Sequence, residues 1–174
     1  MILVAWKPQD SILPPEWEVV PELLAAAREA RERFDNFAPI LTWQAEDGTA
    51  GFTMVKHSAG GLPSAVDEVL TALEAMYGPP AWFAVTVDAY GRIADQQHEP
   101  NLRPDDLSNL FAAGDWAVVE QLMLMVARSG HVGVWRQVYR HTLVDGWEWD
   151  DPEYMLNPVL PDNGLLEILL GHSH

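Results

Sequence analysis

The side chains with the clearest capacity for chemistry are six histidines: His57, His98, His131, His141, His172 and His174. Neutral imidazole ligates zinc or iron and acts as a general base near neutral pH. A metal site needs three or four converging ligands, and the best combination joins His141 and Asp150 to a distant residue such as His98. A structural ion pair between His141 and Asp150 explains the same residues without a metal. We therefore expect no metal and no other cofactor.

Other catalytic signatures are absent from the sequence. It contains no nucleophile elbow, phosphate-binding loop, dinucleotide fingerprint, zinc-protease motif or calcium loop. Neighbouring carboxylates such as Asp150 and Asp151 point to opposite faces of a strand and so do not form an acid–base couple. We expect a non-enzymatic protein. The alternative is a small-ligand-binding protein or metal-dependent enzyme that uses His141 and Asp150.

Acidic and aromatic residues alternate near the C-terminus. Between Arg140 and the end of the chain there is no lysine or arginine, yet five carboxylates fall within residues 145–153. Binding energy at interfaces concentrates in buried aromatic residues with charges at the rim. The segment therefore predicts a surface for a basic protein partner, formed by Trp147, Glu148, Trp149, Asp150, Asp151, Glu153 and Tyr154. A solvated hairpin whose aromatic residues turn into the core explains it equally well.

The whole chain is strongly acidic, with 26 acidic residues against 10 basic ones and a net charge of −16. Spread evenly over roughly 8,500 Å² of surface, these charges would lie on the order of 20 Å apart, beyond the ~8 Å screening length. Concentrated charge would instead speed encounter with a basic partner. Direct nucleic-acid binding is not expected from so few basic residues. Bacterial immunity proteins, antitoxins, phage-encoded inhibitors and secretion chaperones share this size and charge, which is an analogy of composition alone.

Length and composition favour a single globular domain over residues 1–174. The chain is 48% hydrophobic, and its eight Trp, five Phe and four Tyr exclude disorder as the main state. No apolar run reaches the ~20 residues of a membrane span, so no membrane partner is expected. The apolar opening, residues 1–6, is too short for a secretion signal, which predicts a cytoplasmic protein.

The sequence of the first half of the chain predicts two helix–hairpin units, at about 21–57 and 63–98. Apolar spacing and Pro21 predict a helix over 21–35. Asp47-Gly48 predicts a two-residue type I′ turn, with residues 43 and 52 paired. A second helix is expected from Ser64 to Gly78, followed by a strand over 81–88 that turns at Tyr90-Gly91. The pattern predicts an α+β fold with a mainly antiparallel sheet and helices packed on one face.

The second half adds more elements. Helices are expected over 104–114 and over 116–128, and the second of these is apolar nearly all round. That helix is either a central buried element or the surface of a homo-oligomer. A strand over 131–144, with a bulge or bend near Gly133, leads to a turn at Asp145-Gly146.

The register of this last hairpin sets its side-chain contacts. A two-residue turn at Asp145-Gly146 pairs residues 142 and 149, which places Trp147 and Trp149 on the face of Val138. It also predicts the ion pairs His141–Asp150 and Arg140–Asp151. The last apolar segment, residues 165–170, is expected to dock on the body of the protein.

Overall fold

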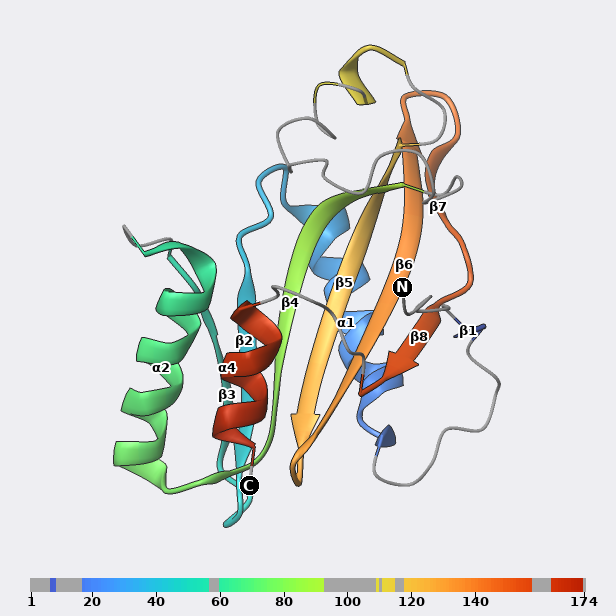
Figure 1. Ribbon diagram of the computed structural model, residues 1–174. Helices are drawn as coiled ribbons and strands as arrows, with labels where there is room; N and C mark the ends of the chain where they lie inside the picture. The colour runs from blue at the N-terminus through green and yellow to red at the C-terminus, as the bar shows by residue number, and fades with distance from the viewer. Residues whose placement is uncertain are drawn as a thin grey trace, which may run out of the picture.

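The computed structural model describes residues 7–8, 17–56, 60–92, 109, 111–114, 118–157 and 164–173. In this part of the chain, three helices pack against one antiparallel sheet of eight strands (Figure 1). The helices are α1 (Val20–Arg33), α2 (Gly61–Tyr77) and α4 (Gly164–His172). The strands are β1 (Lys7–Pro8), β2 (Ile40–Ala45), β3 (Ala50–Met54), β4 (Pro80–Arg92), β5 (Val118–Arg128), β6 (His131–Thr142), β7 (Gly146–Trp149) and β8 (Glu153–Leu156). The predicted α+β class and antiparallel sheet are confirmed.

The three longest strands, β4, β5 and β6, form the middle of the sheet. The strand order is β1-β8-β6-β5-β4-β2-β3, and β7 also pairs with β6. Residues 133–136 of β6 pair with β8, whereas residues 139–142 pair with β7. The length of β6 is therefore explained by two successive partners. Gly133 is in regular register with both neighbouring strands, so the predicted bulge is wrong.

The helices cover both faces of the sheet, so the expectation of helices on one face is wrong. Leu124 of β5 packs in a cluster with Leu24 of α1, whereas Met125 packs in a cluster with Leu70 of α2 and Leu169 of α4. Figure 1 shows α1 behind the sheet and α2 and α4 in front of it. Because successive side chains of a strand point to opposite faces, the middle of the sheet is covered from both sides.

Residues 118–128 form the strand β5, and the predicted helix over 116–128 is wrong for them. β5 pairs with β4 along one edge and with β6 along the other. Most of its side chains are buried, on both faces of the sheet. A strand covered on both faces has a continuous apolar sequence, without the alternation that marks a half-buried strand. Since this chain itself covers residues 118–128, they offer no surface for the homo-oligomer that was one of the two alternatives for 116–128.

The β2–β3 hairpin differs from its predicted register by one residue. Trp43 pairs with Gly51, and the N–H of Gly48 donates to the carbonyl of Ala45 at 3.0 Å. Gly48 has a φ of +89°. These features are typical of a type I turn followed by a glycine bulge, which adds one residue to the expected two-residue loop.

The change in register separates side chains that were expected to share a face. Phe52 and Met54 now lie on the opposite face from Trp43, because a shift of one residue reverses the face. Their exposed fractions are 75% and 65%, whereas Trp43 is buried.

The second helix–hairpin unit is not formed as predicted. β4 continues through Tyr90 and Gly91 in register with β5, so no turn occurs there. α2 begins at Gly61, before Ser64, and no side chain caps it; it ends at Tyr77 before Gly78, as expected. The expected helix over 104–114 lies mostly outside the described residues.

The docking of the last apolar segment is confirmed. Leu165, Leu166 and Leu169 of α4 are buried, in the same cluster as residues of α2 and β6. At the end of α4, the ring of His172 lies between two carboxylates of α2, with Nε2 2.7 Å from Asp67 and Nδ1 2.8 Å from Glu74. His172 therefore connects α4 to α2 through both of its ring nitrogens.

This connection predicts a pH-dependent stability. Burial lowers the pKa of His172, but the hydrogen bonds and charges of Asp67 and Glu74 outweigh it and raise the pKa above the usual 6.5. The contribution is therefore complete below the unfolded pKa and is lost as the pH rises through the higher folded pKa. His172→Ala should lower the free energy of unfolding on the order of 1 kcal/mol at pH 6, since Asp67 is solvent-exposed, and by less at pH 9.

Urea unfolding at both pH values measures this difference. His131→Ala is the control, because His131 is exposed on β6 and forms no ion pair with the described carboxylates. An effect of His172→Ala that stays constant between pH 6 and 9 would contradict the assignment.

Candidate functional site

The β6–β7 hairpin carries three of the seven residues predicted to bind a partner, and the other four follow it along the chain. Thr142 pairs with Gly146 instead of Trp149, a shift of three residues from the predicted register. The Asp145-Gly146 pair is consequently not the centre of a two-residue turn, because Gly146 is already the first residue of β7. With this register, Trp147 lies opposite His141 and Trp149 lies opposite Tyr139. The predicted placement of both tryptophans on the face of Val138 is wrong.

The aromatic residues of the hairpin pack toward α1. The rings of His141 and Trp147 stack with centroids 4.1 Å apart, and those of Tyr139 and Trp149 lie 4.8 Å apart. The indole N–H of Trp149 donates to a carboxylate oxygen of Glu32 on α1 at 2.7 Å. Both tryptophans are half-buried in a cluster with α1. They act mainly as packing residues between the hairpin and the helix.

A polar network lies at the base of this aromatic cluster. Arg31 of α1 donates from Nε to Asp88 of β4 at 2.9 Å and to the Tyr139 hydroxyl at 3.0 Å. The Tyr139 hydroxyl in turn donates to the other carboxylate oxygen of Asp88 at 2.7 Å. The Arg31 guanidinium also lies 5.1 Å from the ring centroid of Trp147. One cation thus joins α1, the sheet and the hairpin.

Two groups near this network have altered pKa values. Burial raises the pKa of the Tyr139 hydroxyl far above its usual range, and the hydrogen bond to Asp88 raises it further. Burial also raises the pKa of Glu120 on β5, with a smaller contribution from the charge of Asp88. Tyr139 therefore stays protonated and donates its hydrogen bond at physiological pH. The arrangement is explained by structural stabilisation.

The carboxylates of the predicted surface divide into paired and unpaired groups. Arg140 donates to Asp150 at 3.0 Å, and Arg136 lies 2.6 Å from Glu153. The predicted pairs His141–Asp150 and Arg140–Asp151 are therefore wrong, because the register places Arg140 opposite Glu148 and its side chain reaches Asp150. Glu148, Asp151 and the turn residue Asp145 are exposed, and none forms an ion pair with another described residue.

The last predicted residue, Tyr154, lies on β8. Its ring stacks on Trp135 of β6 at 6.1 Å between centroids. The three aromatic residues of the predicted surface thus pack on other aromatic rings of this chain. Among the predicted residues, Glu148 and Asp151 are exposed carboxylates without an ion pair in the described part of the chain.

Two apolar residues at the hairpin turn were not among the predicted site residues. Leu143 and Val144 have relative exposures of 103% and 91%. A two-residue turn would have paired both with β7, whereas the three-residue turn leaves them outside the ladder. The signal in the sequence is their position directly before Asp145-Gly146. We define the acidic hairpin surface as Leu143, Val144, Asp145, Glu148 and Asp151.

The described residues give no support to a metal site. No group of three histidine or carboxylate side chains in this part of the chain is arranged to hold a metal ion. His141 stacks on Trp147 while Asp150 pairs with Arg140, so the pair on which the enzymatic alternative depends is not formed. His98 lies outside the described residues.

No helix in the described residues is long and apolar enough to cross a membrane. Comparisons with protein-family models, with curated proteins and with solved structures found no match for this chain.

Proposed function

We propose that this chain is a non-enzymatic, acidic protein-binding module that binds a basic protein partner through the acidic hairpin surface. The observation that carries the proposal is the exposure of Leu143 and Val144 beside carboxylates that have no ion pair in the described structure. Exposed aliphatic side chains at the end of a hairpin contribute nothing to the core of this chain. They become favourable contacts when a partner buries them.

The hairpin is also suited to binding because it is rigidly attached. The network of Arg31, Asp88 and Tyr139 fixes its inner face to α1 and β4. A preordered surface loses less conformational entropy on binding than a flexible loop does. The exposed acids would steer a basic partner toward this end of the sheet and speed association. An inhibitor, an immunity or antitoxin-like protein and a chaperone would all use such a surface.

A matched pair of variants tests the proposal. The hairpin variant Asp145→Asn/Glu148→Gln/Asp151→Asn removes three charges from the acidic hairpin surface. The control variant Glu22→Gln/Asp35→Asn/Glu167→Gln removes three charges from exposed positions elsewhere. Both change the net charge from −16 to −13 (−16 + 3). Any difference between them is due to position and not to total charge.

The partner is captured from a lysate of the source cells at low salt and identified, and its association rate is then measured at several salt concentrations. The hairpin variant should associate about tenfold more slowly at low salt and show a flatter salt dependence, while the control stays near the parent rate. Leu143→Ser/Val144→Ser should mainly speed dissociation. Equal rates for the hairpin and control variants, or capture of acidic proteins only, would refute the proposal.

A further inference from the structure

A second feature that points to a partner is the free edge of β3, at the opposite side of the sheet from β8. Ala45 N–H donates to the carbonyl of Thr49 at 2.7 Å, and Val55 N–H donates to the carbonyl of Pro39 at 2.7 Å. These two bonds identify the hydrogen-bonded pairs of the β2–β3 ladder, which recur at every second residue. The backbone groups of the residues between them point away from β2; these residues are Ala50, Phe52 and Met54.

The edge lacks the usual protection against strand addition. Natural edge strands carry charged residues, prolines or bulges that prevent pairing with another chain. Residues 49–55 contain neither a charge nor a proline. Phe52 and Met54 are also 75% and 65% exposed. Among the described residues, β2 is the only strand paired with β3. Such an edge is available for pairing with a strand of another chain.

A groove of about 390 Å³ accompanies this edge, between α2 and the β2–β3 hairpin. Its lining includes Trp43 and Tyr77, whose rings stack with centroids 4.9 Å apart. Gly51 allows the indole of Trp43 to lie close to β3, because an added Cβ there would be 3.1 Å from the ring. The groove therefore offers an aromatic shelf beside a strand that lacks a second neighbour in the described structure, and the exposed part of this shelf is Tyr77, which lies on the buried Trp43.

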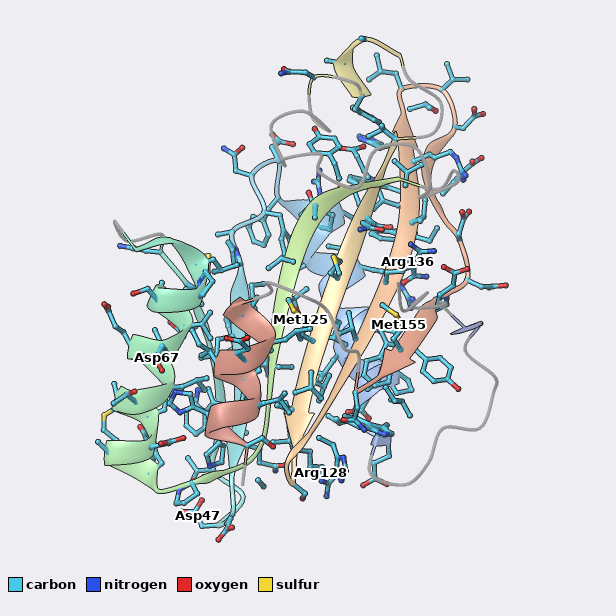
Figure 2. The ribbon with its side chains drawn as sticks, viewed as in Figure 1. Asp47, Asp67, Met125, Arg128, Arg136 and Met155 are labelled. Atoms are coloured by element: carbon cyan, nitrogen blue, oxygen red, sulfur yellow. The ribbon has the colours of Figure 1, made fainter. Side chains whose placement is uncertain are left out.

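The charges around this groove favour a basic occupant. Glu68 of α2 lines the groove and is exposed. Glu46 and Asp47 are exposed at the turn that leads into β3, and Figure 2 shows Asp47 at this end of the hairpin. Lys56, beyond the other end of β3, is the one basic residue in the segment 46–56. A second copy of this chain, with its own charge of −16, would be repelled.

We propose that β3 binds an extended segment of a basic protein as an added strand. Backbone hydrogen bonds would form to Ala50, Phe52 and Met54, as in other cases of strand addition. One apolar or aromatic side chain of the segment packs on Trp43 and Tyr77, and a lysine or arginine lies beside Glu68. This site is at a different sheet edge from the acidic hairpin surface. An experiment can therefore refute one of the two proposed binding sites without affecting the other.

The test uses twelve-residue peptides selected from a random display library on the full-length protein. The selected peptides should be rich in lysine and arginine, and these basic residues should alternate with apolar ones. Phe52→Pro removes an outward-pointing N–H without removing a β2 bond, and edge strands tolerate proline at such positions. Phe52→Ala is the control that keeps the N–H. The peptides should bind Phe52→Pro about tenfold more weakly than Phe52→Ala, because a peptide carbonyl loses its donor.

Two further measurements distinguish a basic peptide bound at the β3 edge from a second copy of this chain or another occupant. Tyr77→Ala, which leaves β3 unchanged, should weaken peptide binding because it removes the exposed ring of the aromatic shelf. In the free protein, the amides of Ala50, Phe52 and Met54 should exchange quickly with solvent. Protection of these amides in the free protein, or a dimer that Phe52→Pro dissociates, would show that the edge is already occupied and would overturn the proposal. Equal affinity of the peptides for the two Phe52 variants would also overturn it, as would a library that yields no binding peptide.

Discussion

Replacing Asp88 with alanine is expected to lower the free energy of unfolding by about 3 kcal/mol, the lower end of the range for breaking a buried ion pair. Asp88 accepts hydrogen bonds from both Arg31 and the buried hydroxyl of Tyr139. The side chain of Arg31 is 13% exposed and that of Asp88 22% exposed, so water replaces the lost acceptor poorly. Urea unfolding followed by tryptophan fluorescence measures the change.

The control for this experiment lies on the same helix. Arg33 and Glu29 form an ion pair at 2.8 Å, but their side chains are 70% and 66% exposed. Glu29→Ala should therefore change the stability by less than about 0.5 kcal/mol. Removing Asp88 should also lower the pKa of Glu120, because one of the two causes that raise it is gone. Equal costs for Asp88→Ala and Glu29→Ala would show that the network contributes little.

The observed helices lie close to segments that the sequence marks by their apolar residues. α1 spans Val20–Arg33 where 21–35 was predicted, α2 lies close to its predicted position, and the apolar segment 165–170 lies within α4. Each of these helices buries one side and exposes the other, so the apolar residues recur with the helical period. The end of α2 before Gly78, with its φ of +79°, was also foreseen from the sequence.

β5 was mistaken for a helix because its environment removes the usual signal of a strand. Leu122 and Leu124 face α1 while Met125 and Ala127 face α2 and α4, so no alternation of polar and apolar residues remains. Leucine, methionine and alanine are also strong helix formers. Only the tertiary structure, which covers both faces, distinguishes such a strand from a buried helix.

The second hairpin of the candidate site was predicted at the right place along the chain, but its register was not. Both hairpins contain an Asp-Gly pair, and in both the loop is longer than the two residues that this pair favours. An error in loop length changes the register and therefore which side chains share a face. As a result Trp147 and Trp149 were assigned to the partner, although they pack on α1, and the exposed Leu143 and Val144 were overlooked.

Trp135 should be the most sensitive single position, because it fills the core between α1 and the β6–β8 pair. It is completely buried, and its ring lies 5.4 Å from that of Trp17 between centroids. Gly133 makes room for it, since an added Cβ there would lie 2.5 Å from the indole. Trp135→Ala should lower the free energy of unfolding by about 3–5 kcal/mol, by loss of apolar contact and creation of a cavity.

Trp135→Phe separates ring packing from hydrogen bonding at this position. The indole N–H of Trp135 is buried and has no hydrogen-bond partner among the described residues, so phenylalanine removes a donor that contributes no bond there. The smaller ring still packs against Trp17 and Tyr154, so the cavity and the expected loss are smaller than those of Trp135→Ala. Urea unfolding of both variants tests this. A loss for Trp135→Phe as large as that for Trp135→Ala would contradict this explanation, because it would show that packing of a phenyl ring contributes nothing at this position.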